Sequence, residues 1–277
     1  MNKLLLKIIE EYRPDIFFVL MGDGILPQTL EKIQKMGIVT VNWFHDSVVA
    51  PIRIKFVQEI SPYYDFFFMI DSEDILKYTK ISSRWVKTVP LGCIPELHRG
   101  VKLSDDERSH YGSDVCFVGT MKFKRAEVLK SLTNFNLGIW GNWLEKKPEL
   151  KNCYRRQNVF GEEAVKIYNA AKIVLDIHLS YGTGDKKFNV TPRLFEVPAS
   201  QTFLLADENA AIADLYKIGE EIICYQDEND LKEKIQYYLT HSEERKLIVQ
   251  RGQQRAYRDH TYEKRLKEIF SIIEKKN

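Results

Sequence analysis

The sequence predicts an α/β fold made of two Rossmann-like domains, each with an open parallel sheet. Short apolar runs alternate with segments of helical periodicity almost from end to end, which is the pattern of consecutive βαβ units. This alternation stops once, over residues 90–113, and then resumes. In addition, 277 residues are long for a single domain and sufficient for two.

Four strands are expected before residue 90. Asp15 is followed by an unbroken apolar run up to Met21, which is typical of a strand buried on both faces of a sheet. Pro27 stands where a helix begins and Gly37 where it ends. The expected strands are 15–21, 38–44, 65–70 and 85–89, and the expected helices are 4–12, 27–36, 51–60 and 72–79.

Residues 90–113 contain two prolines, three glycines and a charged stretch. We interpret them as a junction between domains, since domain boundaries fall in polar segments with Pro and Gly. Beyond the junction the strands are expected at 114–119, 137–141, 173–177, 202–205 and 221–224. Helices are expected at 122–132, 162–171, 191–200 and 210–218, and again from residue 227 to the end.

The composition excludes several classes of protein. Lys and Arg number 41 and Asp and Glu 39, so the net charge of +2 provides neither a basic arm for nucleic acid nor an acidic tail. The four cysteines lack CxxC spacing, which favours reduced thiols over a zinc ribbon or a disulfide framework. No apolar run approaches the roughly 20 residues of a membrane span. We therefore expect a cytoplasmic protein without nucleic-acid partners or a transmembrane segment, for which peripheral membrane contact stays open.

The most informative segment follows the expected strand 173–177. This strand ends at His178, a loop with two glycines follows, and a helix opens near Asn189 with Arg193 and Glu196 three residues apart. Ligands of doubly wound folds bind at the carboxyl ends of strands, and helix starts favour anions. The segment therefore predicts a phosphate or diphosphate near Arg193, with Glu196 accepting the hydroxyls of a ribose. His178 and Asn189 are further candidates for contact with the same ligand. The alternative is an ordinary surface ion pair of Arg193 with Glu196.

Two further strands end in glycine. The strand 114–119 ends in Gly119-Thr120, and Arg125 lies early in the next helix; the strand 137–141 ends in Gly141. A glycine there lets the backbone approach a ligand closely, and Arg125 could reach a diphosphate from the opposite wall. The alternative is that each glycine serves only its turn.

A candidate general base lies in the first half of the chain. His45 and Asp46 follow the strand 38–44, at the edge of the sheet where a side chain facing a ligand belongs. Either group could take the proton of an acceptor hydroxyl. The alternative is that Asp46 caps the following segment through Ser47 and that His45 is structural.

Several short motifs follow one another along the chain. They are Pro14-Asp15, Gly37–Asp46, Tyr64-Asp65, Pro90–Cys93 with His98, Phe117–Gly119, Ile139–Trp143, Arg193–Ala199, and His260–Tyr262 with Arg265. Taken in this order over residues 16–267, the sequence resembles bacterial CgeB-like glycosyltransferases, which are group-1 transferases with a GT-B fold. The part before the first Pro-Asp strand is shorter than in relatives, which carry further βα units there.

The resemblance implies two Rossmann-like domains facing a cleft and a metal-independent transfer of sugar from a nucleotide-sugar. It implies an acceptor-side domain at 1–100, a donor-binding domain at 101–258 and a helix at 259–277 that docks on the first domain. Glu196 matches the ribose-binding carboxylate of the family, and Arg193 and Arg125 would serve the diphosphate. No cofactor is implied beyond the donor substrate, expected to be linked to UDP or GDP. The acceptor would be a glycan, a protein or a small molecule.

One departure from the family pattern supports another function. The family pattern has two carboxylates, of which Glu196 is the second. The first, which commonly contacts the donor sugar, would fall at position 188, which is Phe188 here. The second candidate is therefore a non-catalytic relative that binds a nucleotide or a glycan, as part of surface-polysaccharide or spore-coat assembly.

Overall fold

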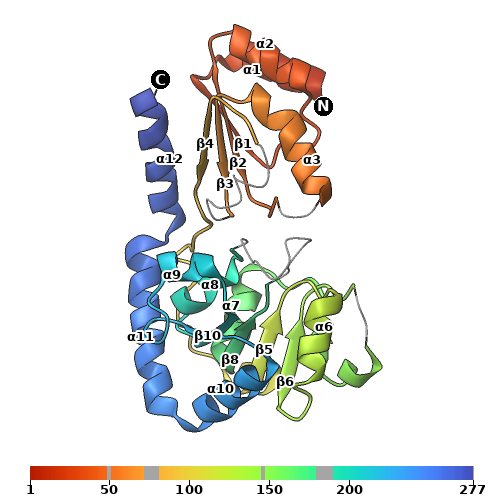
Figure 1. Ribbon diagram of the computed structural model, residues 1–277, viewed down its shortest axis with the longest axis vertical. Coiled ribbons are helices and arrows are strands. Elements are labelled where there is room, and N and C mark those ends of the chain that lie inside the picture. The colour runs from red at the N-terminus through yellow and green to blue at the C-terminus, as the bar shows by residue number, and fades with distance from the viewer. Residues whose placement is uncertain (49–50, 72–80, 145–146, 179–189, 277) are drawn as a thin grey trace. The chain divides into compact units, whose positions relative to one another are not determined.

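The computed structural model describes residues 1–48, 51–71, 81–144, 147–178 and 190–276 (Figure 1). The chain forms two compact units. The N-terminal unit contains Met1–Leu91 and Leu266–Asn277, and the C-terminal unit contains Gly92–Leu179 and Thr191–Arg265. Each unit has its own parallel sheet, so the predicted α/β class with two parallel sheets is confirmed. No helix in the described ranges is long and apolar enough to cross a membrane.

The sheet of the N-terminal unit has four parallel strands in sequential order, β1-β2-β3-β4. The strands expected before residue 90 are confirmed to within one or two residues. They are β1 (Ile16–Leu20), β2 (Val39–Phe44), β3 (Phe66–Met69) and β4 (Trp85–Thr88). The helices are α1 (Asn2–Tyr12), α2 (Pro27–Lys35) and α3 (Pro51–Ile60), followed by a 3-10 turn at Ser61–Tyr63. The expected helix 72–79 lies outside the described residues.

Both faces of this sheet are covered by helices (Figure 1). On one face, Phe44 and Phe67 belong to the same buried cluster as Val57 of α3. On the other face, the ring of Phe18 lies 6.0 Å from that of Phe270 in α12 (Tyr262–Lys276). An ion pair of 2.8 Å joins Lys87 Nζ of β4 to Glu268 Oε1 of α12. Coverage on both faces explains why the strands are continuous apolar runs rather than alternating ones.

The sheet of the C-terminal unit has six parallel strands in the order β10-β9-β8-β5-β6-β7. These are β5 (Ser113–Val118), β6 (Leu137–Trp140), β7 (Tyr154–Arg156), β8 (Ala171–Asp176), β9 (Leu204–Asp207) and β10 (Ile223–Tyr225). Its helices are α6 (Phe123–Lys130), α7 (Gly161–Ala170), α8 (Arg193–Ala199), α9 (Ala210–Leu215), α10 (Glu228–Thr240) and α11 (Ser242–Asp259). The core between them is formed by residues such as Val115, Phe117, Ile173, Leu175 and Leu205, all buried.

One α-helix and one strand of the described residues were not expected from the sequence. Helix α5 (Asp105–Tyr111) lies within the segment interpreted as a junction. The sequence contains the Ser-x-x-Glu spacing of a capping box at Ser104 and Glu107, and the structure forms this box. Ser104 accepts from the Glu107 backbone N–H at 3.2 Å, and Glu107 Oε2 accepts from the Ser104 backbone N–H at 2.9 Å. Strand β7 is three residues long and polar, so it has no apolar pattern. It lies at the edge of the sheet, where neither length nor hydrophobicity is needed.

Candidate functional site

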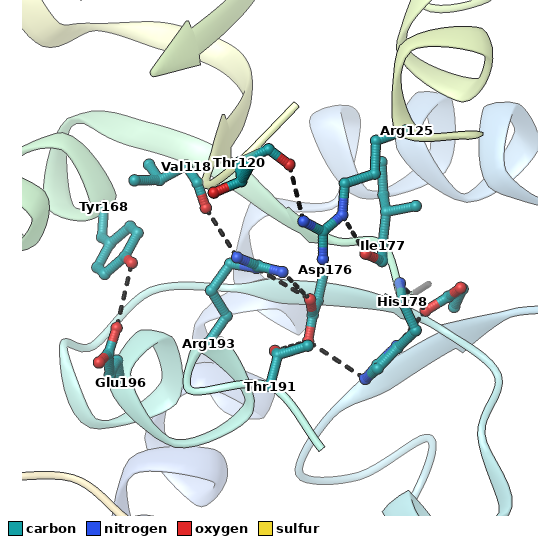
Figure 2. Close-up of polar contacts among 11 residues, drawn as sticks. Val118, Thr120, Arg125, Tyr168, Asp176, Ile177, His178, Thr191, Arg193 and Glu196 are labelled. Atoms are coloured by element: carbon teal, nitrogen blue, oxygen red, sulfur yellow. Dashed lines mark hydrogen bonds and ion pairs between the residues drawn. The ribbon is translucent and has the colours of Figure 1, made fainter. Parts of the chain in front are cut away.

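The strand order of the C-terminal unit reverses between β5 and β8. The chain proceeds from β5 outward to β6 and β7, and then returns to place β8 on the other side of β5. In open α/β sheets, ligands bind at the carboxyl ends of the strands on either side of such a switch point. Gly119 and Thr120 follow β5, and Ile177 and His178 follow β8, so most of the predicted donor-site residues lie at this edge (Figure 2).

A buried ion pair holds the switch point together. Arg193 Nε donates to Asp176 Oδ1 at 2.9 Å, and Arg193 Nη2 lies 2.8 Å from the same oxygen. Arg193 Nη1 donates to the carbonyl of Val118 at 2.9 Å, and the hydroxyl of Thr191 donates to Asp176 Oδ2. Burial raises the pKa of Asp176, but the charge of Arg193, the His178 ring and the Thr191 hydrogen bond together outweigh it and leave the pKa below its ordinary value. Arg193 therefore links α8, β8 and the end of β5 (Figure 2).

Glu196 lies on the same helix but does not pair with Arg193 at the surface. The hydroxyl of Tyr168 donates to Glu196 Oε2 at 3.3 Å, and His98 Nε2 lies 3.9 Å from Oε1. Burial raises the pKa of Glu196, although the charge of Arg193 and the Tyr168 hydrogen bond oppose the shift. About a quarter of the side chain is exposed (26%), which leaves the carboxylate accessible. The surface ion pair considered from the spacing does not form.

The two residues next to Glu196 were missed by sequence reasoning. His98 Nδ1 accepts from the backbone N–H of Ile94 at 3.0 Å, so in the neutral ring Nε2 carries the hydrogen and faces Glu196. Burial lowers the pKa of His98 to about 4, which keeps the ring neutral near pH 7. His98 belongs to the motif with Pro90–Cys93, and that motif was the sequence signal that could have pointed to it. Tyr168 had none, because its contact with Glu196 joins α7 to α8 across the fold.

The two strand-ending glycines pack against each other. A Cβ on Gly141 would lie 2.6 Å from the carbonyl oxygen of Gly119, and φ at Gly141 is +106°. A Cβ on Gly119 would lie 2.6 Å from Arg193 Nη1. A side chain at either position would therefore clash, so the glycines serve close packing as well as their turns.

A small pocket of about 70 Å³ opens beside these glycines. It adds Asn158, Val159 and Phe160 to the predicted site, all from the connection between β7 and α7. Sequence reasoning treated this connection as an ordinary loop, because β7 itself was not recognised. The full lining is Val118, Gly119, Thr120, Gly141, Asn142, Asn158, Val159 and Phe160.

Arg125 is buried and joins the two loops at the switch point. Its Nε donates to the carbonyl of Ile177 at 2.8 Å, and its Nη1 donates to the carbonyl of Thr120 at 2.8 Å (Figure 2). The guanidinium groups of Arg125 and Arg193 also lie over the ring of Phe117, at 5.4 and 5.2 Å from its centroid. Both arginines thus position the strand ends. Direct contact of either with a diphosphate stays a prediction.

His178 is fully buried between two carboxylates. Its backbone N–H donates to Asp207 Oδ1 at 3.0 Å, its Nδ1 contacts the same oxygen, and its Nε2 lies 3.6 Å from Asp176 Oδ2. The ring therefore lies between Asp176 and Asp207 and helps to hold the Asp176 carboxylate in place. This arrangement does not test the predicted contact of His178 with a donor. Asn189 and Phe188 lie outside the described residues.

His45 and Asp46 lie in the N-terminal unit, directly after β2. Asp46 Oδ1 accepts from the Ser47 backbone N–H at 2.9 Å, and Asp46 Oδ2 accepts from Arg53 Nε at 3.0 Å. The ring of His45 lies edge-on to Trp43 at 4.3 Å, and burial lowers its pKa, so His45 is in the form that accepts a proton. The cap on Ser47 is thus present, and a role in catalysis stays a prediction for both residues.

A buried carboxylate fixes the segment that follows Asp46. Asp71 Oδ1 accepts from the Ser47 hydroxyl at 2.9 Å, and Asp71 Oδ2 accepts from the Val48 backbone N–H at 2.8 Å. Only 1% of Asp71 is exposed, and burial raises its pKa to about 7 despite these two hydrogen bonds. Asp71 therefore titrates in the folded protein near neutral pH.

We expect the free energy of unfolding of the protein to decrease as the pH rises, because of Asp71. The folded state holds this proton more tightly than the unfolded chain, so the contribution is greatest below about pH 4 and is lost as the pH rises through 7. Between pH 5 and 7 the free energy of unfolding should fall by about 1–2 kcal/mol more in the wild type than in Asp71→Asn. Urea titrations of both proteins at several pH values measure this difference. Parallel pH profiles would show that Asp71 does not titrate in this range.

The fold and the family of this chain are those of glycosyltransferases. The chain belongs to the glycosyl transferase-like family, whose sequence model matches residues 124–271. It is 27% identical over 253 residues to the spore protein CgeB of Bacillus subtilis (strain 168), covering 86% of this chain and 76% of that protein. The predicted resemblance to CgeB-like glycosyltransferases is therefore confirmed.

Solved structures show the same fold. The chain is similar to Anabaena HepE in complex with UDP and glucose, with a TM-score of 0.74, 11% identity, and coverage of 99% of this chain and 82% of that one. It is also similar to a glycosyltransferase of Rickettsia africae ESF-5, with a TM-score of 0.71, 12% identity, and coverage of 98% and 79%. Sucrose-phosphate synthase of Thermosynechococcus elongatus gives a TM-score of 0.70 at 13% identity, with coverage of 99% and 76%. These similarities confirm the predicted GT-B fold.

Proposed function

We propose that the protein transfers a hexose from a nucleotide-sugar to an acceptor hydroxyl. The observation that carries this proposal is the arrangement at the switch point, where a partly exposed carboxylate, Glu196, and a glycine-walled pocket lie on a glycosyl transferase-like chain. The carboxylate can accept both hydroxyls of a ribose, and the pocket beside Gly119 and Gly141 lets a ligand approach the backbone. UDP-linked sugars are the first donors to test, since HepE was solved with UDP and glucose. GDP-linked sugars come next.

In the reaction, the bond between the sugar C1 and the diphosphate oxygen breaks as the acceptor oxygen bonds to C1. The electron pair leaves with the nucleoside diphosphate. Arg125 and Arg193 lie beside the strand ends. Arg193 is already paired with Asp176, so Arg125 would contribute more of the positive potential that stabilises this leaving group without a metal ion. The acceptor proton passes to a general base, for which we propose His45, because burial keeps its ring neutral. The acceptor would be a glycan, a protein or a small molecule.

The second candidate is a nucleotide- or glycan-binding protein without transferase activity. Phe188 favours it, because this position carries a carboxylate in the family pattern. Only the transferase would break down a nucleotide-sugar, whereas a nucleotide-binding relative would bind it unchanged.

The test is release of free nucleoside diphosphate from a panel of UDP-glucose, UDP-N-acetylglucosamine, UDP-galactose and GDP-mannose, with and without EDTA. A transferase should release UDP or GDP from at least one donor, through slow transfer to water, at a rate that EDTA does not lower. Binding of a donor without release would support the non-catalytic candidate. Neither binding nor release of any donor would reject the transferase and the nucleotide-binding form of the second candidate.

A further inference from the structure

A second and larger cavity lies at the other edge of the C-terminal sheet. Its volume is about 930 Å³, and it is lined by Ser113 at the first position of β5 and Ala171 at the first position of β8. These are the amino ends of the two strands whose carboxyl ends form the candidate donor site. The cavity is therefore separate from that site, and its volume is in the range of small-molecule binding pockets.

The charge of the lining is unbalanced. Four cations, Arg108, Lys172, Arg245 and Lys246, face a single carboxylate, Asp114, which pairs with Lys172 at 2.7 Å. Among the described residues no carboxylate lies within ion-pair distance of Arg108. The Lys246 pair with Glu243 has 71% and 82% exposed side chains and is therefore weak. The cavity thus has the potential to attract an anion.

Ordinary helix energetics explains only part of this charge. Arg108 lies in the last turn of α5, where a helix end favours a cation. Arg245 and Lys246 lie near the start of α11, directly after Glu243 and Glu244 of its first turn, where the helix dipole disfavours cations. Arg245 donates to the carbonyl of Tyr238, which accounts for one of its donors. Lys246 pairs with the exposed Glu243 in the described part of the chain, so a bound anion would be a second partner for it.

Uncharged polar groups without partners complete the lining. The hydroxyl of Ser113 is buried and has no hydrogen-bond partner among the described residues. The amides of Asn136 and Gln250 also line the cavity, and neither side chain bonds to another described residue. Val249, which is partly exposed, supplies apolar surface between them. Amides, a hydroxyl and apolar patches together suit sugar rings, whose hydroxyls need partners and whose C–H faces need apolar contact.

We propose that this cavity binds an anionic oligosaccharide, with sugar units that carry carboxylate or phosphate groups. The cations would hold the acidic groups, and Asn136, Gln250 and Ser113 would bond to the hydroxyls. A single-stranded nucleic acid fits less well, because such sites stack bases on exposed aromatic rings and Phe203 is 2% exposed. This binding site is independent of the proposed transferase reaction.

The test is a calorimetric titration of the full chain with three oligosaccharide probes, and with oligothymidylate as a nucleic-acid control. Hyaluronan hexasaccharide carries carboxylates, phosphorylated mannopentaose carries phosphate, and maltohexaose is neutral. We expect at least one acidic probe to bind and maltohexaose not to bind, with affinity unchanged by saturating UDP. Which acidic probe binds more tightly identifies the acidic group. Equal binding of maltohexaose, displacement by UDP, equal binding of oligothymidylate, or no binding of either acidic probe would overturn the proposal.

Variants locate the binding. Arg108→Ala/Lys246→Ala should weaken the acidic probe by about tenfold or more, because each removed cation takes away a charged hydrogen-bond donor. Lys151→Ala/Lys217→Ala is the matched control, since it makes the same change in net charge at exposed positions that do not line the cavity. An equal loss in both double variants would show only a general effect of charge and would overturn the site. All four substituted side chains are exposed, and thermal melting checks that folding is unchanged.

Discussion

Replacing Arg193 with methionine is expected to lower the free energy of unfolding by about 3–5 kcal/mol. The change removes the guanidinium that contacts Asp176 and leaves a fully buried carboxylate without this counter-charge. The Val118 carbonyl also loses its side-chain donor at the end of β5. Urea unfolding followed by circular dichroism measures the loss, which should appear in the transition of the C-terminal unit.

Two further variants separate this network from a general effect of lost charge. Arg258→Met removes an exposed guanidinium (62%) that pairs with Asp259, and should cost less than about 1 kcal/mol. Arg193→Met/Asp176→Asn removes both charges, and should recover part of the stability lost in Arg193→Met because no buried charge remains unpaired. A loss below about 1 kcal/mol in Arg193→Met would contradict the structural role assigned to this ion pair.

Glu196→Gln is expected to weaken the binding of UDP by about 1.5–3 kcal/mol, which corresponds to roughly 10–150-fold in affinity. The amide keeps the size of the side chain but lacks the charge and accepts through one oxygen only. The preference for UDP over 2′-deoxy-UDP should fall in the variant, because the lost interaction is with the ribose. Calorimetric titration of wild type and variant with both nucleotides measures the two effects.

Two controls accompany Glu196→Gln. Glu220→Gln neutralises an exposed carboxylate of the same unit and should leave UDP binding unchanged. Tyr168→Phe removes the hydroxyl that bonds to Glu196 but keeps the carboxylate, so it should weaken UDP binding less than Glu196→Gln does. If Glu196→Gln changes neither the affinity for UDP nor the preference for the ribose, the prediction that Glu196 binds the ribose is wrong.

The sequence was sufficient to predict the parallel strands of both units, because strands covered on both faces must be continuous apolar runs. It was insufficient for β7 and α5. A three-residue polar strand at a sheet edge has no hydrophobic pattern, and α5 has no buried residue that could produce a periodic one. The capping box of Ser104 and Glu107 was the signal for α5, and such a local signal outweighs weak periodicity.

The candidate site was predictable where the chemistry is local. Gly119 and Gly141 follow apolar strands, and the structure shows that neither position has room for a Cβ. The partners of Arg193 and Glu196 were not predictable, because Asp176 and Tyr168 lie 17 and 28 residues away along the chain. Asp176 nevertheless gave a hint, since a charged residue inside a buried strand requires a buried partner.

The central claim is that a donor nucleotide binds at the carboxyl edge of the C-terminal sheet. Hydrogen–deuterium exchange of the full protein, with and without saturating UDP, tests its location directly. UDP should slow amide exchange in residues 118–121, 141–144 and 158–161, which surround the small pocket beside the two glycines. Exchange at the amino edge, in residues 112–114 and 201–203, should stay unchanged. Binding of UDP with no protection in the first three segments, or with protection only elsewhere, would contradict the claim.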